Sequence, residues 1–119
     1  MERLTMQEEE IMLLIWKLGP CFIRDIVNEM SDPKPPYTSV ASVVRNLERK
    51  QYVSSKKFGV ITQFSPRIKE SEYKRIYMSH IVRDYFTGSY MEMVSFFVRD
   101  RKLTRKDLED LMNQIENEE

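Results

Sequence analysis

The segment 36–53, PYTSVASVVRNLERKQYV, has residues that can bind an anionic polymer on one side of a predicted helix. At about 100° per residue, the other side is an apolar stripe made of Val40, Val43, Val44 and Leu47. The polar side has small residues, hydroxyls and cations, and Glu48 is the only acid between Pro33 and Arg67. Small side chains allow close approach to another surface, and arginine binds phosphates or guanine edges. The pattern indicates a helix that enters a groove of double-stranded DNA; a surface helix poor in acids is the alternative.

Positive charge is concentrated around this helix, although the chain has 19 Lys and Arg against 19 Asp and Glu. Residues 1–32 have three cations and seven acids, net −4, and residues 33–68 have seven cations and one acid, net +6. Residues 69–119 have nine cations and eleven acids, net −2. Because the local field attracts a polyanion more than the total charge does, this distribution favours DNA binding.

No catalytic or metal-binding set of residues accompanies this helix in the sequence. Cys21 is the only cysteine, which excludes a disulfide within the chain, and we interpret it as a small buried hydrophobe. His80 is the only histidine, and no further zinc ligands lie near it. We therefore expect no enzyme activity, no cofactor and no metal site.

Targeting segments are not predicted in the 119 residues. No run approaches the roughly 18 apolar residues that a membrane span needs. The first residues, MERLTMQEEEIM, are acidic where a signal peptide is positively charged. We expect a soluble, cytoplasmic protein without membrane insertion.

Three helices are predicted in the N-terminal part. Thr5 and Glu8 match a capping box for a helix over residues 5–18, and CFIRDIVNEM predicts a short second helix. After the proline-rich turn SDPKPP, the third helix is expected over residues 37–50.

A hairpin over residues 54–64 is predicted to follow the third helix. The residues there favour strands and Gly59 marks the turn, so that Lys56 and Lys57 are expected at the tip. Three helices and a hairpin are the order of a winged helix-turn-helix, in which the third helix enters the major groove. The predicted fold is mainly α with a small β-hairpin.

Three further helices are predicted in residues 69–119. They carry more apolar surface than about fifty residues can bury alone, so we expect a two-fold symmetric homodimer and an inverted-repeat DNA site. The predicted division is a winged-helix DNA-binding domain, residues 1–68, and a helical dimerisation region, residues 69–119. The residues expected at the dimer interface are Tyr77, Ile81, Tyr85, Met93, Phe96, Phe97, Leu108 and Leu111.

The chain resembles the BlaI/MecI/CopY family of bacterial repressors, the penicillinase and copper-transport repressors. The resemblance extends from about Leu4 to Gln114 and rests on LTMQEEEIMLLIWKLG, YTSVASVVRNLERKQYV and FGVITQFSP. It implies a winged helix with a C-terminal helical dimerisation region, and a homodimer that represses genes by binding a palindromic operator. The resemblance assigns DNA contacts to Thr38, Ser39, Ala41 and Ser42, and the residue pattern adds Arg45, Arg49, Lys56 and Lys57.

Two devices of the family depend on residues that this chain lacks. The copper-responsive branch has a cysteine pair near its C-terminus, and no cysteine follows Cys21. The β-lactam branch is cleaved between Asn and Phe, and the matching residues are Phe96 and Phe97, so the Asn is missing. Cleavage there by a different membrane sensor protease stays a hypothesis. The alternative function is a winged-helix protein-interaction module without DNA-binding activity.

Overall fold

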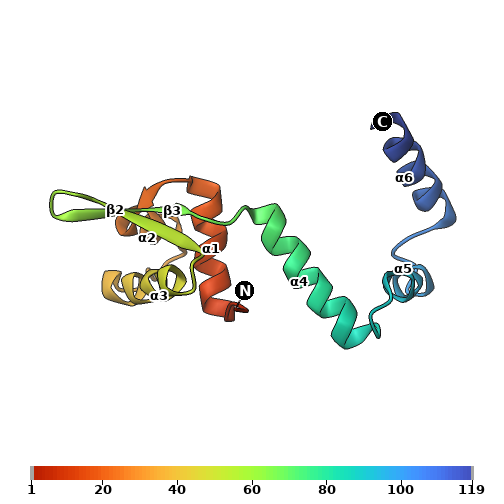
Figure 1. Cartoon of the computed structure of the whole chain (residues 1–119), viewed down its shortest axis with the longest axis horizontal. Helices are drawn as coiled ribbons and strands as arrows, with labels where there is room; N and C mark the ends of the chain where they lie inside the picture. Colours follow the sequence, from red (N-terminus) through yellow and green to blue (C-terminus); the bar gives the residue numbers. More distant parts are fainter. Residues whose placement is uncertain (1, 119) are drawn as a thin grey trace. The chain divides into compact units, whose positions relative to one another are not determined.

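A computed structural model describes residues 2–118 of the chain. This part of the chain has six helices and three short strands, and it forms two compact units that divide between Arg75 and Ile76 (Figure 1). None of the helices in residues 2–118 is long and apolar enough to span a membrane. The mainly helical fold with a small hairpin that the sequence predicted is confirmed.

Three helices build the first unit: α1 (Met6–Leu18), α2 (Ile23–Glu29) and α3 (Tyr37–Arg49). The predicted capping box of α1 is confirmed, because the Glu8 amide donates to Thr5 Oγ1 at 3.1 Å and the Thr5 amide to Glu8 Oε1 at 2.8 Å. The predicted span of α3 is confirmed to within one residue.

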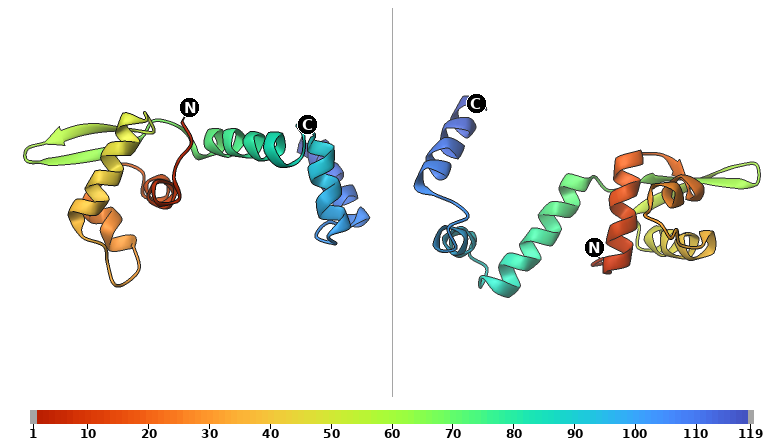
Figure 2. Two further views of the ribbon diagram at one scale, coloured as in Figure 1. Left: turned by 90° about the horizontal axis from the view of Figure 1, so that it is seen from below. Right: turned by 180° about the vertical axis from the view of Figure 1, so that it is seen from behind.

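An antiparallel sheet of three strands, in the order β1-β3-β2, completes the winged-helix unit: β1 (Cys21–Phe22), β2 (Val53–Phe58) and β3 (Ile61–Pro66). Phe58 is paired with Ile61, so the turn between β2 and β3 has two residues, Gly59 and Val60. Gly59 has a φ of 63°, which glycine adopts without strain. The hairpin extends beyond the helices of its unit (Figures 1 and 2).

The prediction that the second helix includes Cys21 and Phe22 was wrong. These two residues form β1, in which Cys21 is paired with Phe64 of β3. The Phe22 amide donates to Asp25 Oδ2 at 2.8 Å. Phe22 is therefore the N-cap, and α2 begins at the next residue, Ile23. Cys21 is buried as expected, and burial together with the nearby Asp25 carboxylate raises the pKa of its thiol to about 11.

The core of the first unit lies between its three helices and the sheet. The whole apolar stripe of α3 is buried there, which confirms the predicted orientation of this helix. The other buried core residues of α1, α2 and the sheet include Ile11, Met12, Ile15, Ile23, Ile26, Tyr52, Val53 and Phe64. The core therefore fixes which face of α3 is turned outward.

The second unit consists of most of α4 (Glu70–Tyr85) together with α5 (Tyr90–Arg99) and α6 (Arg105–Glu118). The first turns of α4 belong to the winged-helix unit, because Tyr73 is buried there and its ring centroid is 5.4 Å from that of Trp16. The predicted cap of the last helix is confirmed by hydrogen bonds in both directions between Thr104 and Asp107. Both hydrogen bonds lower the pKa of Asp107, and the bond from the Thr104 amide has the larger effect.

Candidate nucleic-acid interface

The outward face of α3 is polar and open to solvent. Most of the residues predicted to contact DNA from this helix are exposed: Thr38, Ser39, Ser42, Arg45 and Arg49. Ala41 is half-buried between them. The structure therefore brings the predicted α3 residues onto one surface, with hydroxyls toward the N-terminal half of the helix and guanidinium groups toward the C-terminal half.

The start of α3 adds to the positive character of this surface. Its first turn contains no acid, and Pro36 provides no side-chain cap for the helix. By contrast, α1 and α5 begin with a hydroxyl side chain that accepts a backbone N–H. The positive end of the helix dipole at Tyr37 is thus compatible with a nearby phosphate.

Two cations of the basic segment are occupied within the protein. Lys50 Nζ lies 2.6 Å from Glu8 Oε1 and 3.7 Å from Glu2 Oε2. Lys34 Nζ donates to the backbone carbonyls of Asn28 and Met30, at 3.1 and 2.6 Å, near the end of α2. The net charge of +6 in residues 33–68 thus overstates the charge available to a ligand, which the sequence did not reveal.

The remaining cations on α3 are available. Arg45 and Arg49 form no ion pair with any residue in 2–118. The single acid of α3, Glu48, is half-buried and accepts a hydrogen bond from Ser55 Oγ on β2. The Glu48 carboxylate is therefore turned toward the hairpin, and the outward face of α3 stays cationic.

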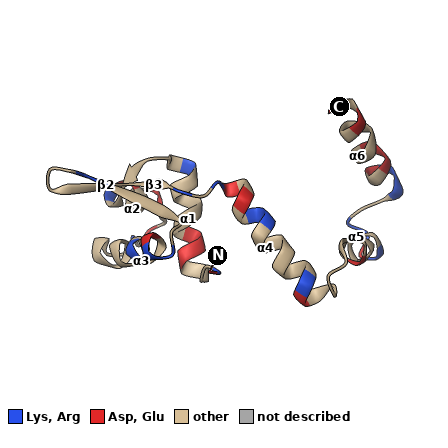
Figure 3. Ribbon diagram, in the orientation of Figure 1, with Lys and Arg blue, Asp and Glu red and all other residues tan. Residues whose placement is uncertain are grey.

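The hairpin, or wing, differs from the prediction at its tip. Lys56 and Lys57 were expected at the tip, but they lie on β2, paired with Gln63 and Thr62. The tip itself is uncharged (Figure 3) and consists of Phe58, Gly59, Val60 and Ile61. The reason is the two-residue turn, which places Gly59 one residue after the strand ends and moves both lysines back along β2.

The two wing lysines have different surroundings. Lys56 Nζ lies 5.3 Å from the centre of the Phe58 ring, in a cation–π contact, because residues two apart on a strand share a face. Lys57 is exposed on the opposite face of β2 and makes no ion pair within the described chain. Both side chains are exposed and can reach a phosphate.

A cleft between α3 and the wing is the feature that sequence reasoning missed. It is lined from α3 by Tyr37, Ala41 and Arg45, and from the sheet and its surroundings by Ile23, Val60, Ile61, Thr62 and Phe64. The apolar residues beside Gly59 in KKFGVI are the signal for it in the sequence, but they equally indicate strands. The cleft is continuous with the polar face of α3.

No metal-binding group accompanies this surface. Within residues 2–118, no cluster of three or more His, Cys, Asp or Glu side chains is arranged to hold an ion. The chemistry of the surface is that of hydrogen-bond donors and fixed positive charge, which suits phosphates and base edges.

The family model of the penicillinase repressors, described as "Penicillinase repressor", matches residues 4–117. The chain belongs to the penicillinase repressor family. Curated relatives are distant in sequence but similar in length. The methicillin resistance regulatory protein MecI of Staphylococcus aureus is 25% identical over 108 residues, which is 89% of this chain and 87% of MecI. The penicillinase repressor of Bacillus licheniformis is 23% identical over 111 residues, 92% of this chain and 86% of the relative.

Proposed function

We propose that this penicillinase repressor family member is a DNA-binding transcriptional repressor that recognises a palindromic operator as a homodimer. In this proposal α3 lies in the major groove and the hairpin of residues 54–64 is the wing. The outward face of α3 carries the proposal, because Arg45 and Arg49 form no ion pair with any residue in 2–118 and the only acid of the helix is turned away. As a repressor of this family the protein is not an enzyme.

The residues of this surface have different roles in the proposal. The hydroxyls of Thr38, Ser39 and Ser42 bind phosphates or base edges, and Ala41 is small enough to meet a thymine methyl group. Arg45, near the middle of α3, contacts bases, and Arg49 contacts phosphate. Lys56 and Lys57 bind the backbone, which supplies affinity without sequence information.

The C-terminal helices support a homodimer. None of the residues of α5 or α6 is buried in the described chain, although both helices have apolar faces. The predicted interface residues are all half-buried or exposed: Tyr77, Ile81, Tyr85, Met93, Phe96, Phe97, Leu108 and Leu111. Apolar surface of this extent is typical of a region that packs against a second copy.

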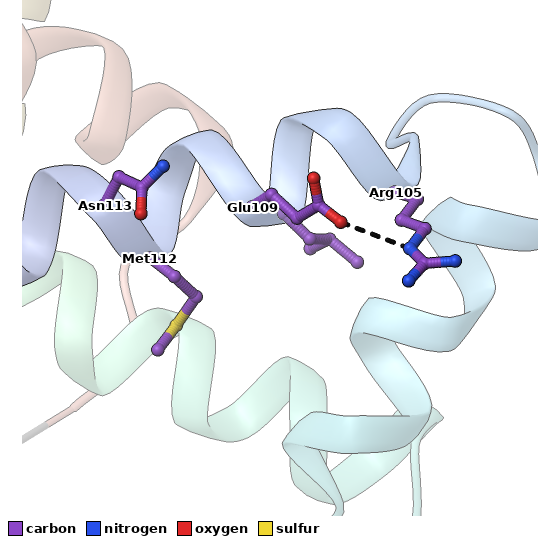
Figure 4. Close-up of a pocket in the computed structure, with 5 residues that line it drawn as sticks. Arg105, Glu109, Met112 and Asn113 are labelled. Atoms are coloured by element: carbon purple, nitrogen blue, oxygen red, sulfur yellow. Dashed lines mark hydrogen bonds and ion pairs between the residues drawn. The ribbon is translucent and has the colours of Figure 1, made fainter.

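The face of α6 illustrates this point. Leu108 and Met112 lie one turn apart and line a shallow hollow together with Arg105, Glu109 and Asn113 (Figure 4). Arg105 Nε lies 3.2 Å from Glu109 Oε1, so this charged pair is beside the apolar residues. An apolar centre with a charged edge is the usual arrangement of a protein interface.

Fluorescence anisotropy with the DNA upstream of the protein's own gene tests the proposal. The control is a scrambled duplex of equal length, and both are measured at two salt concentrations. We expect a preference of roughly 10³ or more for the upstream DNA, and a steep fall of affinity with salt. Weak and equal binding to both duplexes would contradict an autoregulating repressor and favour the protein-interaction module.

Relief of repression by proteolysis in α5 is a separate proposal. Phe96 and Phe97 are exposed there, with ring centroids 5.5 Å apart, at the positions that match the cleavage site of the β-lactam branch. Because this pair lacks the family's Asn, a membrane sensor protease of different specificity would be required. Incubation with the cognate membrane protease without any product would contradict this proposal.

A further inference from the structure

The start of α4 is packed into the winged-helix unit through three aromatic rings. Tyr73 is buried, and its ring centroid lies 5.4 Å from that of Trp16 and 5.9 Å from that of Tyr52. The Trp16 indole donates from Nε1 to the Ile68 carbonyl at 2.8 Å, and the Ile68 side chain is buried as well. Residues 67–85 contain no glycine or proline. The chain therefore enters α4 without a flexible linker.

The Tyr73 hydroxyl adds a directional contact to these rings. It donates to Glu9 Oε2 at 2.6 Å. A buried phenol needs such a partner, and the bond fixes how the ring lies between its neighbours. Glu9 directly follows Glu8, which is paired with Lys50 at the end of α3. Adjacent residues in one turn of α1 thus hold the end of α3 and the start of α4.

Beyond this contact, α4 continues as one uninterrupted helix (Figure 1). Tyr77, Ile81 and Tyr85 follow Tyr73 at intervals of four residues, and all three are proposed interface residues of the homodimer. Sharp kinks occur mainly at proline, at glycine or at bulges, and α4 has neither proline nor glycine. The orientation of its first turns is therefore transmitted along the helix to the proposed interface residues.

The spacing of operator half-sites is the property that such a connection controls. A dimer reads two half-sites together only when the separation and rotation of its two DNA-reading helices match those of the duplex. One additional base pair moves a half-site by about 3.4 Å and turns it by about 35°. A flexible linker absorbs such a change, whereas a clamped helix does not.

We propose that Tyr73 is a specificity-determining residue for operator spacing. Its contacts with Glu9, Trp16 and Tyr52 fix the direction in which α4 leaves the DNA-reading unit. The protein therefore selects operators by the distance between their half-sites as well as by the bases that α3 reads. The inference rests on the proposed function, since it requires a homodimer that binds two half-sites.

A series of operators with altered spacing tests the inference. Footprinting first locates the operator in the upstream DNA, and one or two base pairs are then inserted or deleted at the centre of the inverted repeat. Competition anisotropy with the full chain measures the affinity for each duplex, and a duplex with a single half-site is included. We expect the wild-type protein to bind the altered spacings at least about tenfold more weakly, because simultaneous engagement of two sites is worth about 10²–10⁴ in affinity.

Variants of the hydrogen-bonded pair assign the effect to Tyr73. Tyr73→Phe removes only the hydroxyl, Glu9→Ala removes its acceptor, and Glu9→Gln keeps an acceptor. We expect the first two to lower the ratio between original and altered spacings at least about threefold, while Glu9→Gln retains the wild-type ratio. Tyr90→Phe on α5 is the matched control at an exposed tyrosine.

Binding to the single half-site distinguishes positioning from a purely structural role. We expect Tyr73→Phe to bind this duplex as the wild type does, because the face of α3 is unchanged. Circular dichroism verifies that each variant is folded. A variant that loses affinity equally on all duplexes would overturn the role of Tyr73 in spacing.

The remaining outcomes separate this inference from the proposed function. A wild-type protein that prefers no upstream duplex over scrambled DNA overturns the proposed function and the inference with it. A wild-type protein that prefers the upstream DNA but binds all spacings equally overturns only the inference. The same holds if Tyr73→Phe and Glu9→Ala keep the wild-type ratio, or if Glu9→Gln loses it as Glu9→Ala does.

Discussion

Lys50 at the end of α3 and Glu8 in the first turn of α1 form an ion pair, and their side chains are only 9% and 6% exposed. Glu8 also accepts the Thr5 amide, so one carboxylate both caps α1 and binds α3. Lys50 Nζ donates as well to the Arg3 carbonyl, at 3.3 Å. Helix α3 is thereby joined to α1 at the end opposite to its hydroxyl-rich half.

Replacing Lys50 by Met should destabilise the fold by about 3 kcal/mol, because the Glu8 carboxylate then stays buried without a counter-charge. Chemical denaturation measures this free energy of unfolding. The control is Lys17→Met, since Lys17 and Glu29 form an exposed pair and its loss should cost less than about 1 kcal/mol. Equal losses in the two variants would contradict a special role for the buried pair.

The same pair predicts how stability depends on pH. Burial alone would raise the pKa of Glu8, but the hydrogen bonds and charge of Lys50 and the hydrogen bonds of Thr5 hold this pKa below the usual range of a glutamate. A carboxyl whose folded-state pKa is lowered stabilises the fold above its unfolded pKa, and this stability is lost as the pH falls through the folded pKa. Denaturation between about pH 6 and about pH 3 should show a smaller acid-induced loss in Lys50→Met than in the wild type. Parallel curves would show that Lys50 does not lower the pKa of Glu8.

Arg45→Ala should weaken binding to the operator DNA by about 1–3 kcal/mol if the guanidinium reads a base. The expected loss is smaller on a scrambled duplex, where only a phosphate contact remains to be lost. Competition anisotropy with both duplexes measures the difference, and Lys17→Ala is a matched control because that cation lies on α1. A loss of the same size on both duplexes would assign Arg45 to phosphate.

Lys57→Ala should weaken binding to all sequences similarly, because a cation on the wing contacts the backbone. The slope of log affinity against log salt should decrease by about one. The control is Lys74→Ala, an exposed cation of α4 beside Glu70. An unchanged slope for Lys57→Ala would exclude this lysine from the contact surface.

Leu111→Glu should dissociate the homodimer, because it puts a charge on a half-exposed apolar residue of α6. Sedimentation velocity at several protein concentrations measures the change from dimer to monomer. Met6→Glu on α1 is the control, since Met6 is more exposed and lies outside the proposed interface. A wild-type protein that sediments as a monomer would refute the dimer itself.

Local signals made most of the fold predictable. The capping residues Thr5 and Thr104 each fix a helix start through contacts three residues away, and the α3 stripe requires only the helical period. The strand β1 was missed because Cys21 and Phe22 pair with residues more than forty positions later. A pair of apolar residues before a helix has no period of its own, so only the partner strand reveals that it is extended.

The site was predictable only where it depends on local sequence signals. The outward residues of α3 follow from the buried ones, but the partners of Lys50 and Glu48 do not follow from any spacing. Counting charges treats all cations as equal, whereas Lys50 is paired with the Glu8 carboxylate of α1. The wing tip was misplaced because a two-residue turn and a longer turn around Gly59 fit the same sequence, and they move Lys57 relative to the tip.

The absence of buried residues in α5 and α6 within one chain has a consequence for regulation. If those helices find their core only in a second copy, their stability depends on how much protein is present, and each tenfold dilution removes about 1.4 kcal/mol from the dimer. A cell with little of this protein would then contain chains whose C-terminal helices are weakly ordered. Such chains would no longer bind the two half-sites of the operator together. Repression would respond steeply to the protein's own abundance, so that mass action alone sets a threshold.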